Sequence, residues 1–553
     1  MFERYKRKAV SLLSTTLILV LATACSEADN NTSFNGQRPN ILLIVADDLG
    51  YSDIGAFGGE ISTPNLDDLA SQGLQATNFH TAATCSPTRA MLLSGADNHP
   101  IGLATMPGHL STNQIGKPGY EMHLNDRAFS IADILREGGY HTYFVGKWHI
   151  GGRPEHRPNK RGFERSFALL EGGGSHFDDQ LGPTSYFPKA TYVEDGAEVE
   201  ALPKGFFSTE YYTNKTIDYI EQDKQDNKPF FAVVAYTAPH WPLQAPAEYL
   251  DKYRGAYDKG YQVVSNQRLE KLRKLNLIDA EQEAYLQGVE DWQQLSSEQR
   301  KIESRKMEIY AAMVEHMDDN IGRLLAHLKQ TGDYDNTLIV FISDNGPEGK
   351  NPINLHNNKE WIPQNFDTSY ENMGKPRSFV STGYSWAQVS ALPHRNYKAS
   401  IYEGGISSPM IIHHQTAELK KGIDDSFISV KDLAPTFVEL AGLNHLVERG
   451  VEDGKIPMSG QSILPFLKNK TPKVHPENYA MGWEILGAYG VRKGQWKAVH
   501  TNAGWQLFNL ENDRAEQNER SLTNPEKLEE LIAFWDSYVQ QNGIYLPTEH
   551  VGY

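Results

Sequence analysis

The sequence predicts an α/β fold, in which helices cover both faces of a doubly wound, mostly parallel sheet. Four short apolar runs rich in β-branched residues each lead into a polar cluster, and helical patterns lie between them. Continuous apolar runs of this length are typical of strands buried on both faces. After about residue 464 the pattern changes, which predicts a smaller C-terminal α+β subdomain over 465–553.

Each predicted strand ends directly before a polar cluster. The runs Asn40–Ala46, Thr142–Val145, Phe230–Tyr236 and Thr337–Ile342 precede the polar letters DDLG, GKWH, TAPH and SDNG. Ligands of open α/β sheets bind beyond the carboxyl ends of the strands. We therefore expect the four clusters to meet at one edge of the sheet.

Helices are predicted between these strands. Thr63 has the position of a cap and Pro64 that of the first turn of one helix. Another helix covers Ser130–Arg136 and ends before Gly138. A long amphipathic helix is predicted for Met307–Leu328, directly before the last strand of the four.

Two segments interrupt the predicted catalytic domain, 39–464. The charged stretch from about 252 to 305 has no strand pattern and predicts a solvated helical insertion. The polar, irregular stretch 351–393 predicts a lid or binding loop. Its aromatic residues offer stacking surfaces for a ring or a sugar, or else are ordinary packing residues: Trp361, Tyr370, Tyr384 and Trp386.

The C-terminal subdomain is expected to contain an antiparallel hairpin over 490–499 and 505–510. A helix over 526–539 is expected to follow it.

The N-terminus has the pattern of a secretory signal peptide over residues 1–24. Basic residues between Arg4 and Lys8 precede an apolar run that ends in small residues at Ala24. Cys25 suits a lipoprotein cleavage box, and plain cleavage after Ala24 suits the sequence as well. Residues 25–38 read as a flexible tether. We therefore expect an exported protein, either periplasmic or associated with the outer membrane.

The charge balance restricts the partners. There are 53 basic and 70 acidic residues, a net charge of −17, so the overall field does not attract nucleic acid or an anionic membrane. An anionic substrate would need a local positive pocket. Only two cysteines are present, and if Cys25 is at the processing site, Cys85 has no disulfide partner.

Two pairs of oxygen ligands follow predicted strands. Asp47 and Asp48 end the first strand, and Asp344 and Asn345 end a later one. Carboxylate and amide oxygens suit a hard divalent cation, and the absence of a histidine cluster in the sequence around them disfavours zinc. The alternative for either pair alone is an ordinary acidic strand end.

Cys85 begins the segment CSPTRAMLLSG. Pro87 suits the first turn of a helix, so Cys85 is expected at the positive end of the helix dipole, with Arg89 four residues on and on the same side. A nucleophile activated there, with a guanidinium nearby for the developing anion, fits this arrangement. The alternative is an inert buried cysteine with a surface arginine.

These motifs resemble the signatures of the sulfatase family. CSPTRAMLLSG resembles the first signature and GGYHTYFVGKWHIG the second, and VADDLG and SDNG occur in the family's order. The resemblance, closest to bacterial arylsulfatases, implies the fold of the alkaline phosphatase superfamily. It implies that Cys85 is converted to formylglycine by a maturation enzyme. It also implies one Ca²⁺, held by residue 85 and four others: Asp47, Asp48, Asp344 and Asn345.

The remaining residues of the pocket are placed by the same resemblance. It implies that Lys147 binds the sulfate and that His149 is the base near the formylglycine diol. His240 and Lys398 are implied to contact the sulfate or the leaving oxygen. Each also has a non-functional alternative. Lys147 and His149 could be a surface Lys-x-His pair, His240 an ordinary loop histidine, and Lys398 a solvated lysine. Together with Arg89 they form the positive pocket that an anionic substrate needs.

The predicted function is hydrolysis of sulfate monoesters, either aryl sulfates or carbohydrate sulfates. One alternative is a phosphonate or phosphate ester hydrolase of the same superfamily, since some of those share the Cys-x-Pro-x-Arg motif. A zinc phosphatase is disfavoured because Cys85 stands where Ser or Thr would be expected. A different class of protein, an inactive calcium-binding surface protein, is the second alternative.

Overall fold

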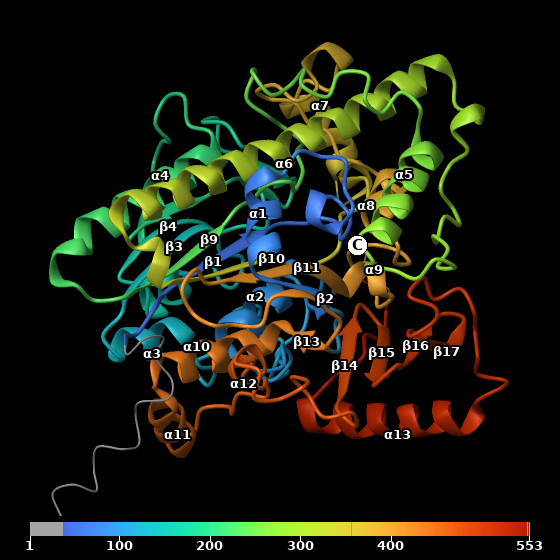
Figure 1. The fold of residues 1–553 in the computed structure, drawn as a ribbon. Helices are drawn as coiled ribbons and strands as arrows, with labels where there is room; N and C mark the ends of the chain where they lie inside the picture. Colours follow the sequence, from blue (N-terminus) through green and yellow to red (C-terminus); the bar gives the residue numbers. More distant parts are fainter. Residues whose placement is uncertain (1–36, 356, 550, 552–553) are drawn as a thin grey trace, which may run out of the picture.

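A central sheet of eleven strands dominates the part of the chain that the computed structural model describes, residues 37–549 and 551 without 356 (Figure 1). The predicted signal peptide, Cys25 and nearly all of the predicted tether lie outside the described residues. The strand order is β12-β2-β11-β10-β1-β9-β3-β4-β7-β8, with β13 beside β2. The strands are β1 (Asn40–Ala46), β2 (Leu74–His80), β3 (His141–Lys147), β4 (Arg165–Leu169), β7 (Tyr192–Glu194), β8 (Ala197–Glu198), β9 (Phe230–Ala235), β10 (Thr337–Ser343), β11 (Ser407–His413), β12 (Gly422–Asp424) and β13 (Ile428–Ser429).

The four predicted strands are neighbours in this sheet and run parallel, in the order β10-β1-β9-β3. The register aligns their carboxyl ends, because Ala46 pairs with Ser343 and Val45 with Ala235. The antiparallel pairings lie further out, beginning with β10 against β11 and β4 against β7. The predicted α/β class with a mostly parallel sheet is therefore confirmed.

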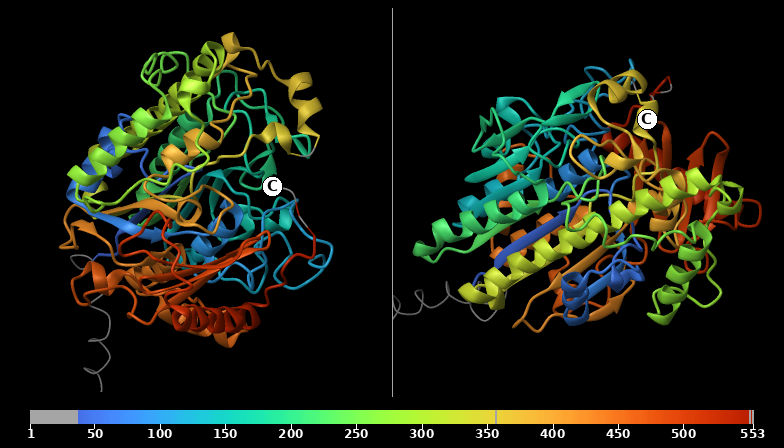
Figure 2. Two further views of the ribbon diagram at one scale, coloured as in Figure 1. Left: turned by 90° about the vertical axis from the view of Figure 1, so that its right-hand side faces the viewer. Right: turned by 90° about the horizontal axis from the view of Figure 1, so that it is seen from above.

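Helices cover both faces of the sheet (Figures 1 and 2). Along β1, alternate side chains belong to two separate cores, since Ile41 packs in one and Leu42 in the other. One face is covered by α1 (Pro64–Gln72), α4 (Ser208–Asp223), α5 (Tyr261–Lys274) and α6 (Ser297–Thr331). The other is covered by α2 (Cys85–Ser94), α3 (Ile131–Glu137), α10 (Leu433–Ala441), α11 (Asn444–Glu452) and α12 (Leu464–Leu467).

The long helix α6 begins earlier than expected, at Ser297, ten residues before Met307, because Ser296 and Gln299 form a capping box. Helix α1 begins at Pro64 after the N-cap residue Thr63, as predicted, but the Thr63 side chain makes no capping hydrogen bond. Instead, the Asp318 carboxylate on α6 accepts hydrogen bonds from the backbone N–H groups at the start of α1, those of Asn65 (3.0 Å) and Leu66 (2.8 Å).

The stretch predicted as a lid contains short helices, α7 (Asn358–Asn365) and α8 (Tyr384–Ser390). Trp386 is fully buried and lies edge-on to Tyr261 and Trp292, so it is a packing residue. The hairpin of β5 (Leu181–Thr184) and β6 (Phe187–Lys189) contacts this stretch, because Ser185 N donates to Asn358 Oδ1 at 2.7 Å.

A four-stranded antiparallel sheet and a helix form the C-terminal unit, at the lower right of Figure 1. The sheet consists of β14 (Ala480–Ile485), β15 (Ala488–Lys493), β16 (Trp496–Thr501) and β17 (Gly504–Asn509). The predicted hairpin lies in it, but its first segment, 490–499, is divided into two strands by a turn at Gly494 and Gln495. Helix α13 (Pro525–Asn542) packs on one face through Leu531 and Trp535. The other face meets the main core, where Trp483 Nε1 donates to Thr81 O at 2.9 Å.

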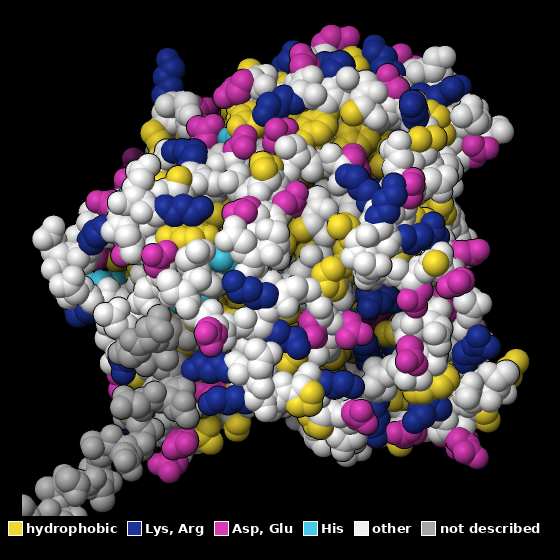
Figure 3. All heavy atoms as spheres, in the orientation of Figure 1, with side chains coloured by type: hydrophobic (Ala, Val, Ile, Leu, Met, Phe, Trp, Pro, Cys, Tyr) yellow, Lys and Arg dark blue, Asp and Glu magenta, His cyan; other side chains and the backbone are white. Residues whose placement is uncertain are grey.

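Lysine and arginine side chains alternate with acidic ones over the face drawn in Figure 3, without one large patch of a single sign. Within the described residues, no helix combines the length and the apolarity that crossing a membrane requires.

Candidate active site

The ten residues singled out from the sequence are brought together at the carboxyl edge of the central strands. Two follow β1, two follow β10, Lys147 is the last residue of β3, and the two histidines follow β3 and β9. Cys85 and Arg89 lie on α2, and Lys398 lies in the loop before α9 (Glu403–Ile406). They are Asp47, Asp48, Cys85, Arg89, Lys147, His149, His240, Asp344, Asn345 and Lys398.

Cys85 is the first residue of α2 and is buried, with 1% of its surface exposed. Its Sγ lies 3.3 Å from Nδ1 of His149. Burial raises the pKa of the thiol, and burial together with Lys147 lowers the pKa of His149 well below its usual range. His149 is therefore neutral and has an unprotonated ring nitrogen that can accept a hydrogen bond from residue 85.

Each of three buried carboxylates contacts a basic side chain. Lys147 Nζ lies 2.8 Å from both oxygens of Asp47. Arg89 donates from Nε and Nη2 to Asp344, at 2.9 and 2.7 Å, and from Nη1 to the carbonyl of Lys147. Burial raises the pKa of Asp47 to about 7, and its acidic neighbours add to this effect against the opposing pull of Lys147.

Asp48 is the third of these carboxylates. Lys398 Nζ lies 2.8 Å from one oxygen, and Asn345 Nδ2 donates to the same oxygen at 2.6 Å. Burial acts to raise the pKa of Asp48, but Lys398 and His240 outweigh it and lower this pKa to about 2. His240 Nε2 lies 3.5 Å from Asp48, and its Nδ1 hydrogen-bonds to the Trp241 carbonyl.

The donor set fits a hard divalent cation. Oxygen or sulfur atoms of Asp47, Cys85 and Asp344 lie within 4.8 Å of one another. Asn345 Oδ1 is buried and has no hydrogen-bond partner among the described residues, although a buried amide oxygen normally has one. Oxygen atoms on several carboxylates and an amide are the ligands of such a cation. A second group contains Asp47, Asp48 and His240, so the predicted site residue His240 lies close enough to two of the carboxylates to share a metal ion, a role that the sequence did not suggest for it.

Two local predictions from the sequence are wrong. The two-residue spacing of Lys147 and His149 predicts an extended segment, but β3 ends at Lys147 and His149 has a left-handed backbone, with φ of 59°. The flanking Pro239 and Pro242 predict an extended loop at His240, but it lies in a turn, where its N–H donates to the carbonyl of Thr237 at 3.0 Å. Both side chains nevertheless reach the cluster.

Three residues at the site were not found from the sequence. A Cβ on Gly172 would lie 2.6 Å from the His149 ring, and a Cβ on Gly173 would lie 3.0 Å from the His240 ring. These glycines therefore let the backbone after β4 approach both histidines. Glu348 Oε2 lies 3.7 Å from Lys398 Nζ. The run Glu171–Gly174, a glutamate followed by three glycines, was the available signal for the first two.

The loop that contains Lys398 is held by the C-terminal unit. Ala399 has φ of 61°, which is strained for a residue with a Cβ, and its N–H donates to Ala83 O at 2.8 Å. At one end of the loop, Arg395 Nη1 donates to the Glu516 carbonyl at 3.0 Å. At the other end, the Glu516 carboxylate accepts from the N–H of Glu403 at 2.6 Å. Glu516 therefore contacts both ends of the Lys398 loop.

Comparison with known proteins agrees with this geometry. A family model described as Sulfatase matches residues 39–443. An uncharacterized sulfatase of Schizosaccharomyces pombe is 41% identical over 536 residues, covering 93% of this chain and 96% of that protein. An arylsulfatase of Klebsiella aerogenes is 39% identical over 447 residues, 80% of this chain and 93% of that one.

Solved structures agree as well. The crystal structure of Ps i-CgsB superposes with a TM-score of 0.67 at 28% identity, covering 93% of this chain and 95% of that chain. The mostly parallel sheet with its helices and small C-terminal antiparallel sheet is consistent with an alkaline phosphatase-like α/β fold. The chain therefore belongs to the sulfatase family of sulfuric ester hydrolases.

Proposed function

We propose that residue 85 acts as a formylglycine and that this chain hydrolyses sulfate monoesters with one bound Ca²⁺. The observation that supports this proposal is the position of Cys85. It lies at the start of a helix, 3.3 Å from a neutral histidine and beside the carboxylates Asp47 and Asp344. Plain thiol chemistry fits this surrounding poorly, because burial raises the pKa of the thiol and disfavours the thiolate.

The proposed cofactors supply two things. Hydrated formylglycine presents a hydroxyl group for attack on sulfur, and Ca²⁺ supplies positive charge beside it. The Sγ atom of Cys85 stands where an oxygen of the modified residue would be. We assign the Ca²⁺ ligands to residue 85 and to the four oxygen donors Asp47, Asp48, Asp344 and Asn345.

The side chains of this chain would then orient the ester and move protons. Arg89, held by Asp344, and Lys147 place positive charge beside residue 85 and the sulfate group. His149, neutral and adjacent to residue 85, accepts a proton from its hydroxyl group. Lys398 and His240 contact the leaving oxygen, and Lys398 supplies the proton that this oxygen needs to depart as an alcohol or phenol.

The decisive variant is Cys85→Ala, which we expect to abolish turnover of 4-nitrophenyl sulfate while the far-UV circular dichroism stays unchanged. Ser86→Ala is the matched control, because the Ser86 hydroxyl is buried with no hydrogen-bond partner among the described residues. Mass analysis of the peptide with residue 85 tests the conversion by the maturation enzyme. An unmodified cysteine in fully active protein, or full activity of Cys85→Ala, would contradict the proposal.

The substrate class is proposed as aryl or carbohydrate sulfate esters. The relative from Klebsiella aerogenes is an arylsulfatase, and one solved relative of 27% identity is a complex with a neocarrahexaose. The site residues are deeply buried, with Lys147, Lys398 and His240 at most 4% exposed. A sulfate group at the end of the substrate can therefore reach them more easily than one in the middle of a flat substrate surface. A panel of sulfated phenols and sugars, with 4-nitrophenyl phosphate as the rival substrate, separates these classes from a phosphoryl hydrolase.

Export is proposed from the sequence alone, with processing after Ala24 and either a lipid on Cys25 or a plain new N-terminus there. Peptide mass analysis of the mature N-terminus distinguishes a lipidated Cys25 from plain cleavage. Recovery of the full-length chain from the cytoplasmic fraction would contradict export.

A further inference from the structure

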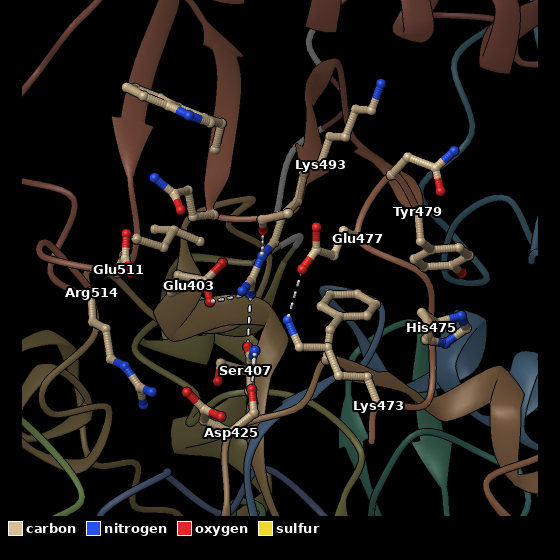
Figure 4. A pocket seen from close by; sticks show the side chains of 18 of the residues that line it. Glu403, Ser407, Asp425, Lys473, His475, Glu477, Tyr479, Lys493, Glu511 and Arg514 are labelled. Carbon is tan, nitrogen blue, oxygen red and sulfur yellow. Dashed lines mark hydrogen bonds and ion pairs between the residues drawn. The ribbon is translucent and has the colours of Figure 1, made fainter. Parts of the chain in front are cut away.

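A cavity of about 740 Å³ lies between the catalytic domain and the C-terminal unit (Figure 4). Its walls come from β2, from the segment around Glu403, from residues 473–479 and from β15 and β16. None of the ten active-site residues lines it. The cavity is therefore separate from the candidate active site.

Two arginines give this cavity positive charge. Arg492 is buried, donates to Asn78 Oδ1 at 2.8 Å and lies over the Phe427 ring at 5.1 Å. Its nearest carboxylate, Glu403, is 3.8 Å away and already contacts Lys497 at 2.7 Å and His80 at 2.8 Å. Burial and the nearby charge of Arg514 both lower the pKa of Arg492.

Arg514 also lines this cavity and is labelled in Figure 4. Its Nη1 lies 3.5 Å from the Thr77 carbonyl, and no carboxylate of the described residues lies within 4.0 Å of its guanidinium. The acidic residues Asp425 and Glu511 on the wall are exposed to solvent. Arg514 thus has no counter-ion within 4.0 Å among the described residues, and Arg492 shares the Glu403 carboxylate with Lys497 and His80. Guanidinium groups in such surroundings can bind a sulfate or carboxylate.

The same cavity has an acceptor for a hydroxyl group. His394 is 1% exposed, and its Nδ1 faces the Arg514 carbonyl at 3.4 Å, so this nitrogen bears the proton. Burial lowers its pKa to about 3, and the ring is neutral. The remaining nitrogen, Nε2, is buried and has no partner among the described residues. Since His394 lines the cavity, this unpartnered acceptor would gain a donor from a ligand that reaches it.

Aromatic and amide side chains complete the wall. Trp496 and Tyr479 line it, as do Asn478 and Gln495. The Tyr479 hydroxyl is also buried without a partner among the described residues. Flat aromatic faces with a few polar groups are the usual lining of a small-molecule site, and amides hydrogen-bond hydroxyl groups in both directions.

We propose that this cavity is a second, non-catalytic binding site for a sugar unit that carries a sulfate or carboxylate group. The anion contacts Arg492 and Arg514, and a hydroxyl group donates to His394 Nε2. The proposal does not depend on the chemistry proposed for residue 85. It predicts that the protein binds an anionic sugar at a place where no ester is cleaved.

Calorimetric titration of Cys85→Ala with glucose 6-sulfate tests this, because that variant is expected to bind without turnover. We expect two classes of site, one of which is lost or weakened at least about tenfold by the added change Arg514→Met. The matched control is Arg449→Met, an exposed arginine paired with Glu137 on another surface. An isotherm that Arg514→Met leaves unchanged would overturn the proposal.

Two further ligands separate the sugar from the bare anion. Glucose, which lacks the anion, and inorganic sulfate, which lacks the hydroxyl groups, should each bind this site at least about tenfold more weakly than glucose 6-sulfate. Equal affinity for inorganic sulfate would mean an anion site only, and would refute the sugar assignment. If Arg514→Met does not fold, crystals of Cys85→Ala grown with glucose 6-sulfate decide: density beside Arg492 supports the proposal, and density confined to the active site refutes it.

Discussion

Replacing Glu516 by glutamine should reduce the pH dependence of stability. Glu516 is fully buried, and its Oε1 lies 2.9 Å from Lys497 Nζ, although not in hydrogen-bond geometry. Burial, together with the charge of Glu403, raises its pKa from 4.5 to about 7. A raised pKa means that the folded protein holds this proton more tightly than the unfolded chain. The resulting stabilisation is complete below pH 4.5 and is lost as the pH rises through about 7.

The shift corresponds to about 3 kcal/mol between these limits. The glutamine amide would have no proton to lose, so urea unfolding of Glu516→Gln at about pH 5 and about pH 8 should show a difference smaller by about 2.5 kcal/mol, the part of the shift that lies between these pH values. Glu281→Gln, at an exposed position, is the control. Equal pH dependence of Glu516→Gln and the unchanged protein would refute the reasoning.

Three other changes probe the site and its support. Asn345→Ala removes an oxygen with no protein partner among the described residues, so calcium content by elemental analysis and turnover should both fall, the latter about tenfold or more. Gly173→Ala places a Cβ about 3.0 Å from the His240 ring. It should lower kcat about tenfold with little change in melting temperature, because the ring would be displaced. An unchanged kcat would mean that the backbone moves to make room for the Cβ. Arg268→Met leaves the buried Asp53 without its partner at 2.6 Å and should cost about 3–5 kcal/mol in urea unfolding, and a loss below about 1 kcal/mol would contradict this.

The gathering of the site residues could be predicted because it depends on local patterns. Apolar runs identified β1, β3, β9 and β10, and parallel strands place their carboxyl ends at one edge. The polar residues directly after each run had to lie there. The position of Cys85 at the start of a helix could be predicted as well, since Pro87 marks the first turn of that helix.

Contacts between distant parts of the chain were not predictable in this way. Thr63 is the N-cap residue of α1 as predicted, but the carboxylate that accepts from the first N–H groups of this helix belongs to Asp318, more than 250 positions along the chain. The hydrogen bond from the Glu403 N–H to the Glu516 carboxylate joins the Lys398 loop of the main domain to the C-terminal unit. The left-handed backbone of His149 is equally invisible in the sequence, because a histidine is ordinarily extended or helical.

The basic side chains of the site serve two kinds of anion. Three carboxylates of the site each contact one basic side chain: Asp47 contacts Lys147, Asp48 contacts Lys398, and Asp344 contacts Arg89. Without these contacts the buried negative charges would be uncompensated in the low-dielectric interior. A divalent cation bound to the same carboxylates would supply that compensation. The lysines and the arginine would then be available to the sulfate group. An acidic protein can thus present a positive pocket, since the positive charge needed for substrate and the negative charge needed for metal lie within one buried cluster.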